Sequence, residues 1–281
     1  MQPYATLNAS QTNFDNSYDR PDRRGYFSVL GALDDMIADV AEPLIRQILR
    51  ARQMRSGRPP TVLEVGCSYG ISAVVHRFAL RFPDLPLRYA NSEMAGVDPE
   101  ALAQFDRQYY GSWPHIGAAR VVGLEVSAPA VRYTASVGLL DAGMIANFET
   151  DAPRPEGRCA LREAAVVLST GCIGSVTDGP FAAILDSTDR PPWVVSFGLR
   201  RFPHEAIGAM FAERGLVTER RAAATFVQRR FLDLTERSNC WRRSGSSVWI
   251  PRDSRPRGAS RRSCPSRTHA RTSWPRRSAG C

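Results

Sequence analysis

Lysine is absent from the 281 residues, so all 37 basic side chains are arginines. Residues 1–237 carry 26 arginines and 27 acidic residues, whereas residues 238–281 carry 11 arginines and one acidic residue. A nucleic-acid-binding domain normally concentrates its positive charge on the folded surface. The net charge of +9 therefore does not indicate a nucleic acid partner, and we expect only weak, non-specific contact through the tail.

Long apolar runs and paired cysteines are also lacking. No stretch of 18 apolar residues occurs, and the first 20 residues contain neither a basic start nor a hydrophobic segment, so we expect a cytoplasmic protein without a membrane partner. The six cysteines lie far apart and form no C-x-x-C motif. We expect reduced thiols and no metal site.

Apolar, strand-like segments alternate with helical patterns along the middle of the chain. The predicted strands are PTVLEVG (60–66), ARVVGLEV (119–126), GMIANF (143–148), EAAVVLST (163–170) and PWVVSFGL (192–199). Predicted helices lie at 127–140, 176–186 and 204–214. This order predicts an α/β protein with a Rossmann-like, doubly wound, mostly parallel sheet and helices on both faces.

The segments around this core suggest three domains. Residues 1–58 form a helical N-terminal lead-in, residues 59–237 the ligand-binding domain, and residues 238–281 a disordered tail. Within the domain, residues 83–118 read as a solvent-facing helical insertion, although LPLRYANSE could instead be a strand. The segment GLVTERRAAATFVQRRF predicts one long strand or a hairpin.

The turn after the first strand carries the clearest chemical signal. Its sequence, EVGCSYG, lacks the glycine spacing of a dinucleotide-binding turn, which disfavours a nicotinamide cofactor. It reads instead as E-x-G-x-S-x-G, in which Gly66 and Gly70 allow close backbone approach and Glu64 supplies a carboxylate. The ammonium group of an amino acid suits that carboxylate.

The stretch VLEVGCSYG resembles the first motif of class I S-adenosylmethionine-dependent methyltransferases, and the resemblance extends from about Tyr18 to Phe231. Segments such as LSTGCIGSV and PPWVVSFGLRRFP are similar to a bacterial subgroup that acts on small molecules. The resemblance implies that S-adenosyl-L-methionine is the cofactor. It implies roles in binding that cofactor for Glu64, Gly66, Ser68, Gly70, Glu125, Asn147, Phe148, Ser169, Thr170 and Gly171.

By the same resemblance, Glu125 holds the ribose hydroxyls, Asn147 and Phe148 flank the adenine, and the residues from Ser169 to Gly171 line the floor of the site. Glu125 lies 61 residues after Glu64, where about 20 is usual for the comparable acid of a Rossmann unit. Glu93 is the competing candidate if LPLRYANSE is the second strand. The buried-strand pattern of ARVVGLEVS favours Glu125.

The catalytic residues, the acceptor atom and the oligomeric state stay open. Tyr18, Tyr26 and Phe27 could shield the sulfonium as part of a lid, or pack between helices. Cys67 reads as a packing residue rather than a nucleophile, whereas Cys172 lies where a substrate would approach and reads either as a residue that contacts it or as an apolar packing residue.

The tail after Arg237 has the composition that out-of-frame reading of GC-rich DNA would give. Three functions therefore compete. They are a small-molecule methyltransferase, an RNA-modifying methyltransferase that uses the tail as a basic arm, and an inactive remnant.

Overall fold

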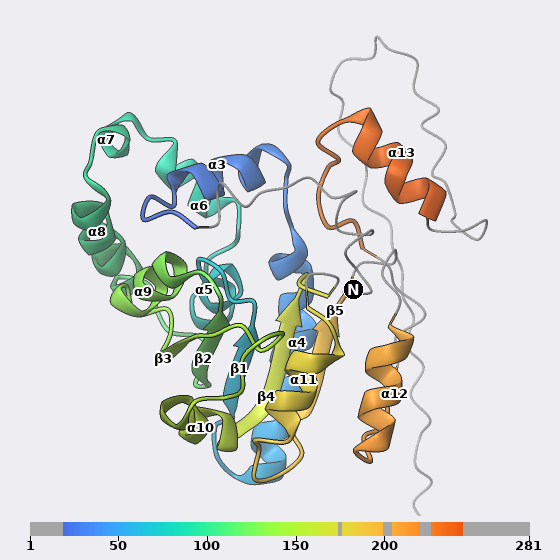
Figure 1. Cartoon of the computed structure of the whole chain (residues 1–281). Helices are drawn as coiled ribbons and strands as arrows, with labels where there is room; N and C mark the ends of the chain where they lie inside the picture. The colour runs from blue at the N-terminus through green and yellow to red at the C-terminus, as the bar shows by residue number, and fades with distance from the viewer. Residues whose placement is uncertain (1–18, 174–175, 199–203, 220–225, 244–281) are drawn as a thin grey trace, which may run out of the picture. The chain divides into compact units, whose positions relative to one another are not determined.

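The computed structural model describes residues 19–173, 176–198, 204–219 and 226–243, which belong to one compact unit. Its centre is a sheet of five parallel strands in the order β3-β2-β1-β4-β5 (Figure 1). The strands are β1 (Thr61–Val65), β2 (Arg120–Glu125), β3 (Ala142–Ile145), β4 (Ala164–Thr170) and β5 (Trp193–Phe197). The predicted α/β, Rossmann-like class is confirmed.

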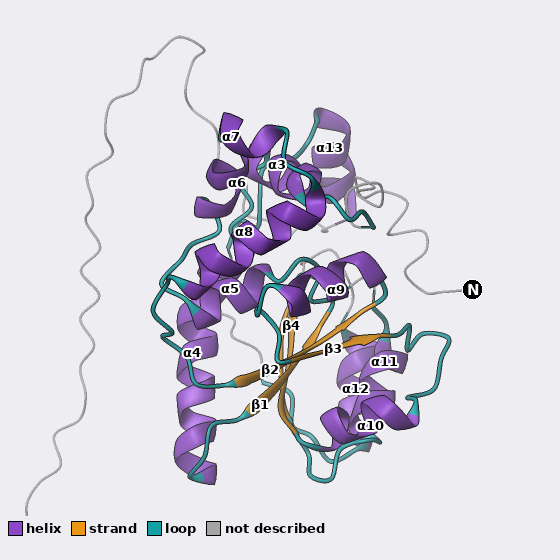
Figure 2. Ribbon diagram, turned by 90° about the vertical axis from the view of Figure 1, so that its left-hand side faces the viewer, coloured by secondary structure: helices purple, strands orange, loops and turns teal. Residues whose placement is uncertain are grey.

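Helices cover both faces of the sheet (Figure 2). Side chains alternate along each strand, so Val62 packs with helix α4 on one face while Leu63 packs with α11 and α12 on the other. The first face carries α4 (Ile37–Ser56), α5 (Ile71–Arg77) and α9 (Ala128–Ser136). The second carries α10 (Pro155–Arg162), α11 (Asp178–Leu185) and α12 (Glu205–Glu213).

The insertion between β1 and β2 is helical, as expected. It contains α6 (Asp84–Tyr89), α7 (Ser92–Ala95) and α8 (Pro99–Gly111). The alternative reading of LPLRYANSE as a strand is wrong. The expectation of a solvent-facing insertion is also wrong in part, because Leu102, Asp106 and Tyr110 are buried.

Asp106 lies at the centre of a buried polar network that joins three parts of the chain. Its Oδ2 accepts hydrogen bonds from Arg23 Nη2 (2.6 Å), Tyr89 Oη (2.6 Å) and Tyr133 Oη (2.9 Å). Its Oδ1 accepts one from Arg88 Nε at 3.0 Å. Arg23 and Asp106 are 1% and 0% exposed, so this ion pair is fully desolvated. The network fixes the N-terminal residues to the insertion and to α9.

Helix α3 (Arg24–Ala32) continues from Arg23 and packs through its aromatic residues. Tyr26 and Phe27 are 4% and 0% exposed, and their rings contact Tyr69 and Tyr89 at centroid distances of 4.8 Å and 5.0 Å. These two residues therefore belong to the helix-packing cluster and not to a lid. Tyr18 lies outside the described residues.

The predicted strand or hairpin after α12 does not form in the residues that are described, 216–219 and 226–231. Residues 228–230 instead run beside the loop before α4, where Met36 N donates to Gln228 O and Arg230 N donates to Leu33 O. Residues 220–225 lie outside the described part of the chain. The strand pattern fails here because these residues bond to a loop rather than to the edge strand β5.

Helix α13 (Leu234–Arg243) spans the predicted start of the tail at residue 238. Glu236 is 6% exposed and accepts hydrogen bonds from Arg229 and from Leu232 N. The first six residues assigned to a disordered tail are thus helical, and residues 244–281 lie outside the described part. Among the helices of the described residues, none is long and apolar enough to cross a membrane.

Truncation after Arg243 is expected to leave the unfolding midpoint unchanged, because the cut preserves α13 and the Arg229–Glu236 pair. It should also abolish salt-sensitive retention on heparin, since most of the excess arginine lies beyond that point. Urea denaturation and heparin chromatography at several salt concentrations measure both effects. A shorter product that ends at Arg237, and therefore lacks most of α13, is compared with it in the same two measurements. Loss of folding in the longer product would show that residues 244–281 complete the fold.

Candidate functional site

The candidate site lies at the carboxyl end of the central strand. Strand β1 pairs with β2 on one side and with β4 on the other. The chain therefore builds the sheet outward from β1 toward one edge, through β2 and β3, and then toward the opposite edge, through β4 and β5. Ligands of open α/β sheets bind at this switch point. The turn after β1, residues 66–70, occupies it.

The backbone of this turn requires residues that tolerate a left-handed conformation. Gly66 and Gly70 have φ values of 71° and 80°, and Ser68 adopts φ 48° without being glycine. A Cβ at Gly66 would lie 3.0 Å from Cys172 Cβ, and one at Gly70 would lie 2.9 Å from a methyl carbon of Leu139. The protein itself fills the space beside both glycines, so they explain the turn but do not by themselves indicate a ligand.

Glu125 lies at the end of β2, directly beside this turn. Its Oε2 accepts a hydrogen bond from Ser68 N at 2.9 Å, and its Oε1 accepts one from Val126 N at 2.7 Å. The predicted strand order is confirmed, because β2 pairs with β1 through Glu64 and Gly123. Glu93 lies instead in the short helix α7 and is exposed. Glu125 is therefore the acid at the switch point.

Glu64 is the most deeply buried acid of the turn region, with 1% of its surface exposed. Its Oε2 has no hydrogen-bond partner among the described residues. The pKa of Glu64 is raised to about 7, mainly by burial; the Ser72 hydroxyl opposes this shift, and the charge of Glu125 adds to it. The side chain points to the α4 and α5 face of the sheet, like Val62 two residues earlier.

A cluster of hydroxyl and thiol groups lies at the carboxyl end of β4. Thr170 Oγ1 lies 2.7 Å from Ser72 Oγ, and Ser169 Oγ lies 2.8 Å from Cys172 Sγ. Burial raises the pKa of Cys172 to about 12, so its thiol stays protonated and is a poor nucleophile at neutral pH. Gly171 has φ 83°, and its N donates to Phe197 O at the end of β5.

The two residues expected to flank an adenine lie beyond a shorter strand than predicted. Strand β3 ends at Ile145, and Asn147 begins a turn in which its Oδ1 accepts from Glu149 N. Asn147 is exposed, whereas Phe148 is 9% exposed and belongs to the core on the α11 and α12 face. The structure therefore places only Asn147 of this pair on the surface.

Several polar residues near the site were missed from the sequence. Ser127 Oγ donates to Asp19 at 3.0 Å, which places the N-terminal segment beside the end of β2. Asp35 is 5% exposed, and burial raises its pKa to about 6. Gln228 Nε2 lies 3.7 Å from the Cβ position at Gly171. No local motif marks Asp19, Asp35 or Gln228, because each comes from a segment distant in the chain from the turn after β1.

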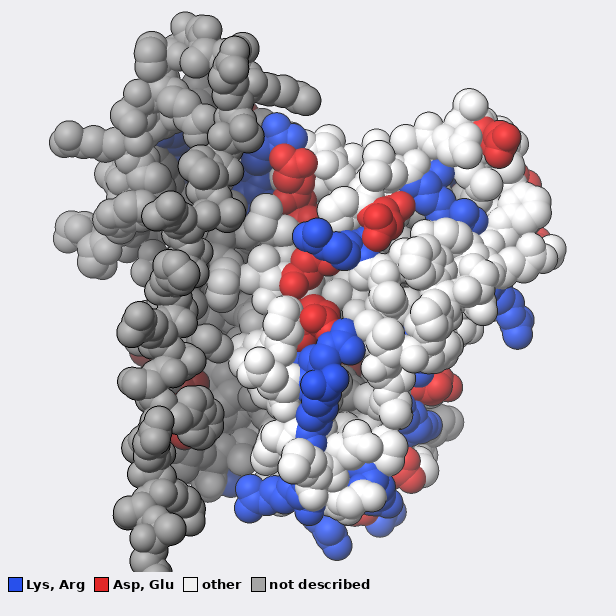
Figure 3. Space-filling view, turned by 180° about the vertical axis from the view of Figure 1, so that it is seen from behind, with Lys and Arg blue, Asp and Glu red and all other residues white. Residues whose placement is uncertain are grey.

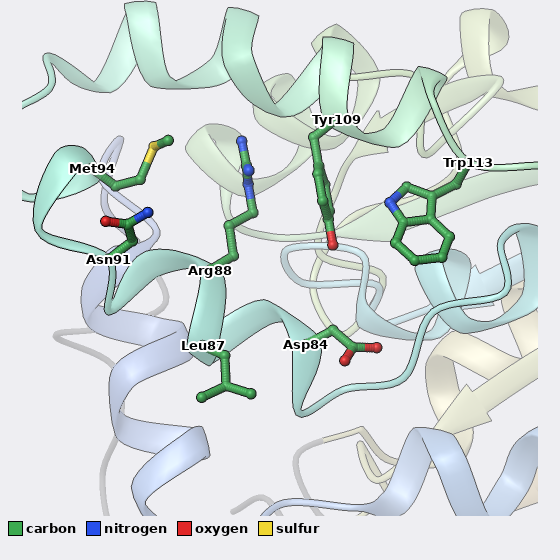
Figure 4. A pocket seen from close by; sticks show the side chains of 7 residues that line it. All are labelled: Asp84, Leu87, Arg88, Asn91, Met94, Tyr109 and Trp113. Carbon is green, nitrogen blue, oxygen red and sulfur yellow. The ribbon is translucent and has the colours of Figure 1, made fainter.

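A surface hollow of about 400 Å³ lies on the insertion, away from the switch point (Figure 4). Arg88 stacks over the Tyr109 ring there, 4.1 Å from its centroid, while its Nε bonds to Asp106. None of the seven lining residues has a buried side-chain polar atom without a partner among the described residues. The hollow therefore shows no unsatisfied group that would indicate a polar ligand.

Comparison of the chain with protein-family models, with curated proteins and with solved structures finds no match.

Proposed function

We propose that this protein transfers a methyl group from S-adenosylmethionine to a small-molecule acceptor. The observation that carries the proposal is the position of Glu125. Its carboxylate lies at the carboxyl end of β2 and is held by Ser68 N of the β1 turn, at the switch point of the sheet. In folds of this kind an acid at that position accepts hydrogen bonds from a ribose diol.

The residues of the turn suit such a cofactor. Each carboxylate oxygen of Glu125 accepts from backbone amides and keeps lone-pair capacity for ribose hydroxyl groups. The Ser68 hydroxyl is buried and has no partner among the described residues, so it is free to bond to a ligand. When bound, S-adenosylmethionine would supply an activated methyl group on a sulfonium.

The contribution expected of the chain is positioning. Transfer from a sulfonium needs the acceptor in line with the sulfur–methyl bond, and holding both molecules in place supplies much of the rate. The proposal assigns no general base. Thr170 ends β4 and Cys172 follows it, at the same end of the sheet as Glu125, and we assign their hydroxyl and thiol groups to orienting an acceptor. Ser169, which is 0% exposed, supports Cys172 from within the strand.

A small-molecule acceptor is favoured over RNA by the distribution of charge on the body. On the face seen from behind, described acidic and basic side chains lie next to one another down the middle of the surface (Figure 3). Binding of RNA phosphates favours a continuous basic surface. An inactive remnant is the third hypothesis, and failure of the folded protein to bind either form of the cofactor would favour it.

Isothermal titration with S-adenosylmethionine and S-adenosylhomocysteine tests the proposal. Glu125→Ala is expected to weaken binding by about 1.5 to 3 kcal/mol, or roughly 10- to 150-fold, because hydrogen bonds to a charged acceptor are lost. Glu93→Ala is the matched control and should bind like the parent, since Glu93 lies in α7. Circular dichroism confirms that both variants fold. Absence of binding in the folded parent, or equal losses in the two variants, would contradict the proposal.

A further inference from the structure

A second cavity lies between α4, α5 and the sheet, on the side of β1 toward which Glu64 points. Its volume is about 170 Å³. Residues of α4, including Arg46 and Arg50, line it together with His76 and Arg77 of α5, and it reaches Glu64. Because a water molecule takes up about 30 Å³ in the liquid, this volume is large enough for a small organic molecule.

Unsatisfied polar atoms gather in this cavity. Seven side-chain atoms of the described residues are buried without a hydrogen-bond partner, and three of them belong to residues that line it. They are Glu64 Oε2, His76 Nε2 and Arg77 Nε. Glu64 and Arg77 are 1% and 9% exposed. A buried polar atom without a partner is costly, so three at one cavity point to a polar ligand.

Some charged side chains around the cavity are paired with an opposite charge of the protein and others are not. Arg46 is paired with Glu42, and Arg77 with Asp141. Glu64 has no ion pair within the described part of the chain, and neither has Arg50, which is exposed. One negative group at the buried end and one positive group at the exposed end are therefore left without a protein partner.

We propose that this cavity binds a small zwitterionic α-amino acid. The ammonium group would donate to Glu64 Oε2, and the carboxylate would accept from Arg77 Nε and face Arg50. The unsatisfied acceptor Glu64 Oε2 is thus paired with the positive group of the amino acid. The unsatisfied donor Arg77 Nε is paired with its negative group. It is a different ligand site from the switch point at Glu125 and does not rest on methyl transfer.

L-Alanine and its two blocked forms test the proposal by isothermal titration in phosphate buffer. N-Acetyl-L-alanine lacks the ammonium group, and L-alaninamide lacks the carboxylate. We expect L-alanine to bind and each blocked form to bind at least tenfold more weakly, because each lacks one of the two charges that the cavity is proposed to match. Equal affinity for the three compounds, or no binding of L-alanine by the folded protein, overturns the proposal.

Two alanine-to-tryptophan variants locate the site. Ala118 lines the cavity, so Ala118→Trp is expected to fill it and reduce L-alanine binding at least tenfold. Ala51, exposed on α4 outside the cavity lining, gives the matched control Ala51→Trp, which should bind like the parent. Unchanged L-alanine binding by a folded Ala118→Trp variant places the amino acid elsewhere and overturns the assignment. Titration of the same variants with S-adenosylhomocysteine reports separately on the switch point.

Discussion

Replacing Asp106 with asparagine is expected to destabilise the protein by about 3 to 5 kcal/mol, the range measured when one partner of a buried ion pair is removed. Asparagine keeps the size of the side chain but not its charge. Arg23, which is 1% exposed, would then remain buried as a cation without its counter-charge. Urea denaturation monitored by circular dichroism measures the loss.

Two further variants show whether the loss comes from the unpaired charge. Asp189 forms an ion pair with Arg162 in which both side chains are more than half exposed, so Asp189→Asn should cost only about 0 to 1 kcal/mol. The double variant Arg23→Met, Asp106→Asn should recover part of the stability, since no unpaired charge remains buried. Similar losses for Asp106→Asn and Asp189→Asn would show that the buried network contributes little.

Glu64→Gln is expected to gain stability relative to the parent as the pH rises. In the folded protein the pKa of Glu64 is about 7, against an ordinary value of 4.5. Between these values the folded state binds more protons than the unfolded state, so stability falls with rising pH, and the full loss is present above pH 7. The variant has no such group. Its stability relative to the parent should therefore improve by about 2 to 3 kcal/mol between pH 5 and pH 8.5.

Urea titrations at the two pH values measure this difference between variant and parent. Other groups whose pKa values are shifted, including Asp35 and His76, are present in both proteins and cancel in the comparison. Glu93→Gln, which changes an exposed acid in α7, is the control. A pH-independent difference for Glu64→Gln would mean that Glu64 ionises as readily in the folded state as in the unfolded chain.

Much of the central sheet could be predicted from the sequence because its three inner strands, β1, β2 and β4, are buried on both faces. Continuous apolar runs, such as VVGLEV before Ser127, identify such strands without knowledge of their partners. The strand before Glu125 also fixed the choice between Glu125 and Glu93. The predicted strand at 143–148 was too long, because β3 lies at the sheet edge and Asn147 turns the chain there.

Contacts between distant segments could not be predicted in this way. Asp106 stands among polar residues in a helix, so its local pattern indicated exposure, while its partners come from α6, α9 and the residues before α3. The inward direction of Glu64 and the cavity behind it likewise depend on how α4 and α5 pack on the sheet. Periodicity reports which face of an element is apolar, but not which polar residue on that face is buried.

The separation of Arg23 and Asp106 in the chain also has a consequence for synthesis on the ribosome. These residues are 83 positions apart. At typical translation rates, Arg23 would leave the ribosome roughly 4 to 17 s before Asp106. During that interval α3 and its aromatic side chains have no insertion to pack against. Helix α3 therefore leaves the ribosome several seconds before the residues that bury its aromatic side chains, and those side chains are exposed to other proteins during that time.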